Sequence, residues 1–93
     1  IIKMLERSSA KSKEMTYGQA MSFLQHLYNS GIGVSEWYSF RAGESQINSG
    51  ICFINTASNR DTVLISRNKI MEFYLTWIKN EENELLFSIT VRT

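Results

Sequence analysis

The side chains that could do nucleophilic chemistry are few in this sequence. It contains one cysteine, Cys52, and one histidine, His26. A nucleophile needs an adjacent base and a group that orients that base, whereas Cys52 lies in the apolar stretch GICFIN. We expect Cys52 to be a small buried residue and His26 to lie on the flank of a helix. The sequence therefore does not predict a thiol and imidazole pair.

Acidic side chains do not indicate a metal or acid–base site either. The densest group, Glu81, Glu82 and Glu84, falls between a predicted helix and a predicted strand, where a solvated turn explains it. The single aspartate, Asp61, lies in a turn-rich segment. One cysteine and one histidine cannot complete a usual structural zinc site, and no segment has calcium-loop spacing. The sequence predicts no metal, no cofactor and no enzymatic activity.

Length and composition indicate one small globular domain. The 93 residues are 43% hydrophobic and 20% charged, which is ordinary for a globular protein. We expect a single domain over 1–93, with 1–15 forming a strand or an arm and a linker. The net charge of +1 gives no bulk attraction to nucleic acid or membranes. A single cysteine, no spanning apolar run and no signal-peptide core predict a cytoplasmic protein with no membrane partner.

Two segments have the spacing of amphipathic helices. The first has Thr16 as N-cap, with Gln19 completing a capping box, and Gly31 as the C-terminal stop. The second is predicted to begin at Asn68 and repeats apolar residues at helical spacing: Ile70, Phe73, Tyr74, Trp77 and Ile78. Each helix should bury one face.

The remaining apolar segments predict strands. We expect strands at 34–41, 51–56, 62–66 and 85–93, and a fifth at 1–5, with polar loops between them. The predicted fold class is α+β, with two amphipathic helices on one face of a four- to five-stranded, mainly antiparallel sheet. The order of elements comes near the ferredoxin-like plan with an additional hairpin strand.

The stretch EWYSFR, residues 36–41, places large aromatics on both sides of one strand. Successive side chains of a strand point to opposite faces. If Tyr38 and Phe40 face the helices, then Trp37 and Arg41 face away. Segments 51–56 and 62–66 are apolar on both sides, as in strands that are buried on both faces.

The second sheet face is therefore predicted to be covered. The segment IIKML, a second copy in a homodimer or a different protein could cover it, and these alternatives stay open. A tryptophan beside an arginine is a combination enriched at interface hot spots. The predicted partner-binding residues are Trp37, Arg41, Leu64 and Leu86.

The leading functional hypothesis is a non-enzymatic protein–protein interaction module that acts as an inhibitor, adaptor or regulatory subunit. Phages and mobile elements encode many short, cofactor-free proteins of this class, and the composition is compatible with such a source. The alternative is a single-stranded nucleic-acid-binding domain with stacking aromatics on its sheet. Its predicted phosphate contacts are Arg41, Arg60, Arg67, Lys69, Lys11 and Lys13.

Overall fold

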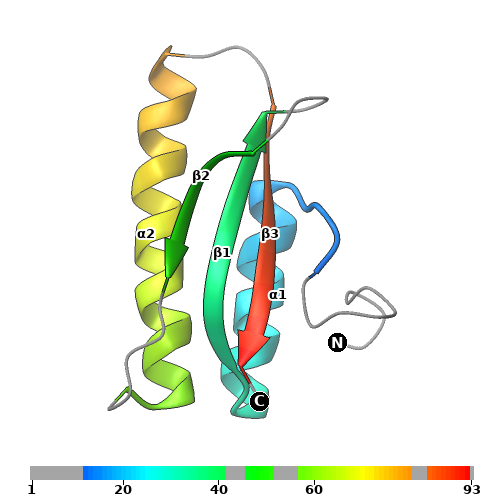
Figure 1. Ribbon diagram of the computed structural model, residues 1–93, viewed down its shortest axis with the longest axis vertical. Helices are drawn as coiled ribbons and strands as arrows, with labels where there is room; N and C mark the ends of the chain where they lie inside the picture. Colours follow the sequence, from blue (N-terminus) through cyan, green and yellow to red (C-terminus); the bar gives the residue numbers. More distant parts are fainter. Residues whose placement is uncertain (1–11, 42–45, 52–56, 81–83, 93) are drawn as a thin grey trace.

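The computed structural model describes residues 12–41, 46–51, 57–80 and 84–92. Within them the chain forms two helices and a three-stranded sheet (Figure 1). The elements follow in the order α1 (Tyr17–Ser30), β1 (Gly33–Arg41), β2 (Gln46–Ile51), α2 (Asn59–Asn80) and β3 (Leu85–Arg92).

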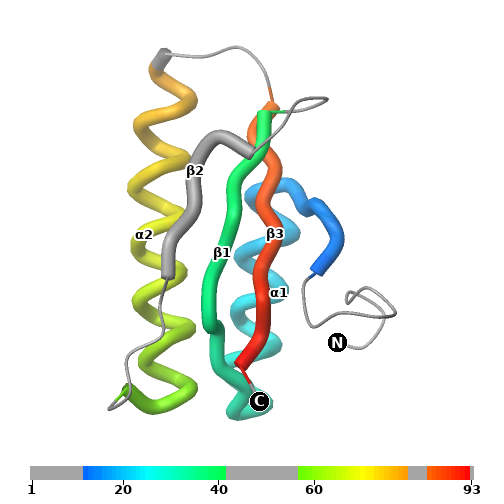
Figure 2. The backbone as a smooth tube through the Cα atoms, viewed as in Figure 1, coloured from blue at the N-terminus to red at the C-terminus, as the bar shows by residue number. Residues whose placement is uncertain are grey.

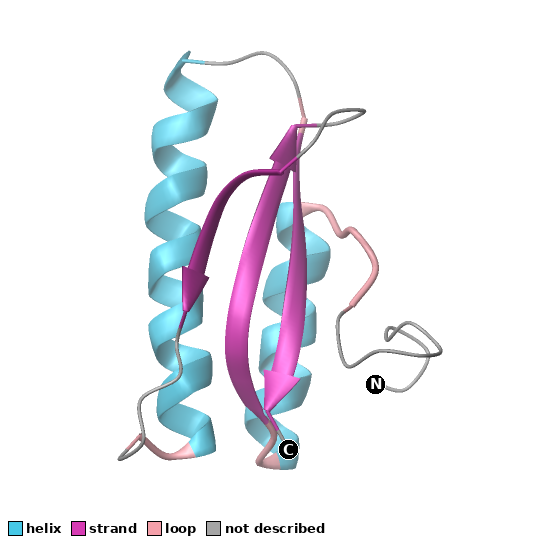
Figure 3. Ribbon diagram, in the orientation of Figure 1, coloured by secondary structure: helices cyan, strands magenta, loops and turns pink. Residues whose placement is uncertain are grey.

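The sheet has the order β2-β1-β3, and β1 pairs antiparallel with both neighbours. Figure 3 shows both helices on the same side of the strands. The helices run antiparallel, because Tyr17 at the start of α1 stacks on Tyr74 late in α2, while Arg60 at the start of α2 lies over the ring of Tyr28. Figure 2 shows residues 12–16 beside β3, where Met15 forms a bridge with Phe87.

The predicted first helix is confirmed. Thr16 is the N-cap of α1 and forms the capping box with Gln19. Gly31 ends the helix with φ 72°, a left-handed conformation that glycine adopts without a steric penalty. The helix buries one face, as predicted, through four residues: Ala20, Phe23, Leu24 and Leu27.

The predicted four- to five-stranded sheet is wrong, because three strands pair within the described part of the chain. Segment 62–66, predicted as a strand, lies inside α2, which begins at Asn59 and not at Asn68. Val63 and Ile70 lie one heptad apart on the buried side of this helix. The β-branched side chain of Val63, which suggested a strand, therefore packs into the core from a helix.

The loop prediction around residue 46 is also wrong. Gln46–Ile51 forms β2 and pairs with β1, in a segment whose polar composition suggested a loop. The ferredoxin-like plan with an extra hairpin strand is therefore not the observed topology. The predicted strands at 1–5 and 52–56 lie outside the described residues.

The start of α2 is tied to three other elements by hydrogen bonds. Asn59 Nδ2 donates to the carbonyl of Gly31 at 2.9 Å, and Arg92 Nε donates to Asn59 Oδ1 at 3.0 Å. The amide of Val34 donates to Thr62 Oγ1 at 2.8 Å, and this hydroxyl donates to the Asn59 carbonyl at 2.6 Å. Gly31, Val34 and Arg92 are far from the helix start in sequence. The residues next to the helix start therefore do not predict where it begins.

The core lies between the sheet and the two helices. The last predicted strand is confirmed as β3, and its alternate residues Leu85, Phe87, Ile89 and Val91 are buried. They meet buried apolar side chains of both helices, among them Phe23, Leu24, Leu27, Val63 and Ile70.

The predicted facing of β1 is reversed. Trp37 is 3% exposed and packs in the core, with its ring 6.3 Å from that of Phe73 and 6.4 Å from that of Phe87. The pairing of β1 with β3 shifts register between Val34 and Glu36. Such a bulge inserts one residue and changes the parity of the strand, so Val34 and Trp37 both face the helices. The prediction that Trp37 faces away from them is therefore wrong.

Candidate protein-binding surface

The described residues hold no cluster that suggests metal chemistry. Among them, no group of three or more histidine, cysteine, aspartate or glutamate side chains could hold a metal ion. His26 is exposed on α1, and Cys52 lies outside the described residues. Neither helix of the described chain is long and apolar enough to cross a membrane.

The face of the sheet that points away from the helices has a mixed character. We call it the outer sheet face, formed by half-buried residues of β1 and β3: Glu36, Tyr38, Phe40, Leu86 and Thr90. The Tyr38 hydroxyl donates to the Glu36 carboxylate, and this hydrogen bond, together with burial and the glutamate charge, raises the pKa of Tyr38. Polar and charged groups therefore interrupt the aromatic and aliphatic area of this face.

The exposed large apolar side chains of the described chain lie on α2. Leu64 is 41% exposed, Leu75 49% and Ile78 52%. Half-buried Met71 falls between them in the same helix. Residues at such spacing share one side of a helix, so the four form a line, which we call the α2 stripe: Leu64, Met71, Leu75 and Ile78.

The relative lengths of the helices explain why the end of this stripe is exposed. Helix α1 has 14 residues and α2 has 22. The first residue of α1, Tyr17, stacks on Tyr74 with ring centroids 3.9 Å apart, so α2 continues past the start of α1 (Figure 1). On the sheet side of this extension Trp77 contacts Phe73 and Arg41. Leu75 falls on another side of the helix, beyond the reach of α1.

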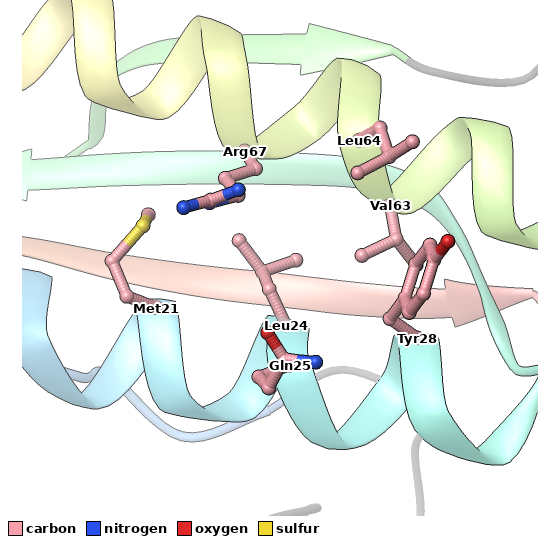
Figure 4. Close-up of a pocket in the computed structure, with 7 residues that line it drawn as sticks. All are labelled: Met21, Leu24, Gln25, Tyr28, Val63, Leu64 and Arg67. Atoms are coloured by element: carbon pink, nitrogen blue, oxygen red, sulfur yellow. The ribbon is translucent and has the colours of Figure 1, made fainter.

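The other end of the stripe borders a pocket between the helices. The pocket has a volume of about 240 Å³ and is lined by Met21, Leu24, Gln25, Tyr28, Val63, Leu64 and Arg67. Figure 4 shows these side chains approaching one another from the two helices. Leu64 belongs to both the pocket and the α2 stripe, so the apolar surface continues from the stripe into the groove between α1 and α2.

Polar side chains border the stripe. Arg67 and Glu72 are exposed, and at about 100° per residue they fall on opposite flanks of the line from Leu64 to Ile78. Asn68, also exposed, lies within the line, between Leu64 and Met71. An apolar centre with a polar rim is the usual anatomy of a protein–protein interface.

The four predicted partner-binding residues do not come together. Trp37 is in the core. Arg41 is half-buried with its guanidinium carbon 5.4 Å from the centre of the Trp77 ring. Leu86 lies on the outer sheet face and Leu64 on the α2 stripe.

The surface exposure of two stripe residues is not predicted from the sequence. Leu75 is absent from the predicted contacts, and Ile78 is predicted on a buried helix face, although both are about half exposed. The signal that could have found them is the spacing of Leu64, Asn68, Met71, Leu75 and Ile78, which alternates between four and three residues. This helical spacing begins at Leu64, inside the segment that is predicted as a strand at 62–66, and is therefore not recognised.

The basic residues predicted to contact nucleic acid are dispersed. Arg60 Nε donates to the Tyr28 carbonyl at 3.1 Å, and Arg67 lines the interhelical pocket. These two and exposed Lys69 belong to α2, whereas Tyr38 and Phe40 lie on the outer sheet face. Arg41 packs over Trp77, Lys13 is exposed before α1, and Lys11 lies outside the described residues. The structure does not bring the basic residues of α2 onto the face of the aromatics.

Comparisons with known proteins add no family assignment. No family model matches the chain, and no curated protein and no solved structure matches it at a significant level.

Proposed function

We propose that this chain is a non-enzymatic protein–protein interaction module that binds a protein through the α2 stripe, in the role of an inhibitor, adaptor or regulatory subunit. The observation that carries the proposal is the exposure of Leu64, Leu75 and Ile78, at 41%, 49% and 52%, along one side of one helix. Contiguous apolar surface with a polar rim typically marks an interaction site.

The stripe is held on a rigid support. Other sides of α2 hold it in the domain: buried Val63 and Ile70 lie about 100° around the helix from the stripe, and Phe73, which contacts Trp37, lies opposite it. A preformed helix loses little conformational entropy when a partner binds. Complete burial of a leucine or isoleucine side chain contributes about 1.5–3 kcal/mol, and anchors spaced at one and two helical turns are the usual means of helix recognition. The stripe thus offers several anchors without an ordering penalty.

Site-specific photo-crosslinking tests this proposal. A benzophenone amino acid replaces Leu75 on the stripe, and a matched variant carries it at His26, which is exposed on α1. Both proteins are irradiated in an extract of the source cells. We expect protein adducts from position 75 that are lost when Leu64→Glu and Ile78→Glu are added, and few adducts from position 26. Absence of adducts at 75, or equal adducts at both positions, would contradict the proposal.

A further inference from the structure

We infer that the protein bound by the α2 stripe is a second copy of this chain, docked with α2 against α2 in a parallel, in-register pair. The inference rests on the proposed function, because it names the occupant of the same stripe. Its starting point is the spacing of four, three, four and three residues between Leu64, Asn68, Met71, Leu75 and Ile78. That spacing is the seam of a two-stranded coiled coil, in which positions a and d meet the partner helix.

This seam is separate from the side of α2 that packs in its own domain. Val63 and Ile70 are 2% and 0% exposed, whereas the seam residues one position later, Leu64 and Met71, are exposed and half-buried. One apolar face satisfies the domain core. The helix therefore carries a second apolar face that the fold of a single described chain does not use.

The charged residues beside the seam complement a second copy. With Leu64, Met71 and Ile78 at d, Arg67 takes position g and Glu72 the following position e, five residues later. In a parallel pair a g residue faces the next e residue of the other helix. Arg67 of each chain would then face Glu72 of the other, so the two-fold pair would contain two such ion pairs. An antiparallel pair centred on Met71 would instead bring Glu72 close to its own copy.

Asn68 favours the same arrangement. It occupies position a, in line with Leu75, and is exposed. A parallel, in-register pair places the two Asn68 amides opposite each other, where each can donate and accept a hydrogen bond. A shifted or antiparallel pair would place the amide against an apolar side chain. A single asparagine at position a is a known determinant of register and of the two-stranded state.

The arrangement of the helices leaves room for a second α2. Tyr74, which stacks on α1, and Val63, which lines the interhelical pocket, each precede a seam residue by one position. Helix α1 therefore lies about 100° around α2 from the seam, and the sheet lies further round. A second helix can approach to about 8–10 Å, with a two-fold axis parallel to α2, without displacing α1.

Charge reversal tests the inference in purified protein. Sedimentation velocity is recorded from roughly 10 µM to 1 mM, where weak interfaces associate. We expect wild type to reach the dimer mass. Arg67→Glu and Glu72→Arg alone should each raise the dissociation constant about tenfold, because two like-charge contacts replace two ion pairs. The combined variant should return to within about twofold of wild type, since the pairs are re-formed with opposite polarity.

The control is Lys69→Glu, which reverses an exposed charge off the seam and should leave the dissociation constant unchanged. Far-ultraviolet circular dichroism checks that each variant is folded. A wild-type chain that stays monomeric, or a combined variant no better than the single ones, would overturn the inference. If the chain is monomeric but position 75 crosslinks to another protein, the inference fails and the proposed function stands. If position 75 also gives no adduct, both fail.

Discussion

Trp37 is a core residue that carries a polar atom without a visible partner. Its side chain is 3% exposed, and its indole nitrogen has no hydrogen-bond partner within the described structure. Leaving a buried donor unsatisfied costs about 1–3 kcal/mol. The packing of the ring against Phe73 and Phe87 offsets this penalty. Trp37 therefore stabilises the domain through its apolar area, and its N–H opposes that effect.

Substitutions at Trp37 should separate these two contributions. Trp37→Ala should lower the free energy of unfolding by about 3–5 kcal/mol, because it removes the buried apolar surface of the indole ring and leaves a cavity. Trp37→Phe keeps an aromatic ring and removes the unpaired donor, so it should lower that free energy by about 1.5 kcal/mol or less. Urea unfolding monitored by circular dichroism measures both. Equal losses for the two variants would contradict this account, because the phenyl ring would then recover none of the apolar packing.

Tyr38 should make stability depend on pH in the alkaline range. Its hydrogen bond to Glu36, with burial and the glutamate charge, raises the pKa of Tyr38 in the folded protein above the ordinary value of 10.0. The unfolded chain then loses this proton at lower pH than the folded one. The stabilising contribution is complete below pH 10 and falls as the pH rises through the folded-state pKa.

Absorbance titration of the tyrosines at alkaline pH checks this shift. The sequence has four tyrosines, and Tyr38→Phe identifies the contribution of Tyr38 by difference. We expect Glu36→Ala to move the pKa of Tyr38 down towards its ordinary value, because both the acceptor and its charge are removed. An unchanged pKa in that variant would show that Glu36 is not the cause.

At the scale of elements, β1 passes close to the start of α2. A Cβ atom on Gly33 would lie 2.6 Å from Asn59 Oδ1 and 2.9 Å from Thr62 Oγ1. Both side chains are held by hydrogen bonds to other elements. Neither can move away without breaking one of these bonds. Gly33 is therefore required for close approach of the strand to the helix.

Gly33→Ala should lower the free energy of unfolding by about 1–3 kcal/mol, as expected for overpacking. Gly18 is a matched control, because it lies in α1 and a Cβ atom added there would have nothing within 4 Å. Gly18→Ala should raise that free energy by up to about 1 kcal/mol through helix propensity. Thermal and urea unfolding measure both variants. A neutral Gly33→Ala would mean that Asn59 can turn away without consequence.

Sequence patterns predict those elements whose signals are local. The capping box of Thr16 and Gln19, the stop at Gly31 and the alternation in β3 each act within a few residues, and each is confirmed. The start of α2 depends on hydrogen bonds from Asn59 to Gly31 and Arg92, which only the folded chain brings together. The inward facing of Trp37 depends on a bulge that strict alternation cannot reveal.

The candidate site is predictable only in part for a similar reason. Leu64 is predicted as a contact on the second face of a strand at 62–66; the strand is wrong, because the segment lies in α2, but the residue is exposed. The exposure of Leu75 and Ile78 follows from the fact that α2 extends beyond α1, which is a relation between two elements. The four–three spacing in the sequence marks a second apolar line on the helix, but it does not say that α1 leaves this line uncovered.

At the scale of the whole molecule, two surfaces compete for the role of contact surface. The outer sheet face combines Phe40 and Leu86 with the hydrogen-bonded pair of Glu36 and Tyr38. The α2 stripe is an apolar line interrupted only by the uncharged Asn68, and it contains the most exposed large apolar side chains of the described chain. The physical preference is for the stripe, because burying it leaves no charged group without water.

Sedimentation velocity of two matched variants tests this preference most directly. Leu75→Glu places a charge on the stripe, and Phe40→Lys places one on the outer sheet face, each checked for folding by circular dichroism. At a concentration where the wild type is dimeric, the structure predicts that Leu75→Glu is monomeric and that Phe40→Lys remains a dimer. A dimer that survives Leu75→Glu and is dissociated by Phe40→Lys would contradict the assignment of the α2 stripe as the protein-binding surface.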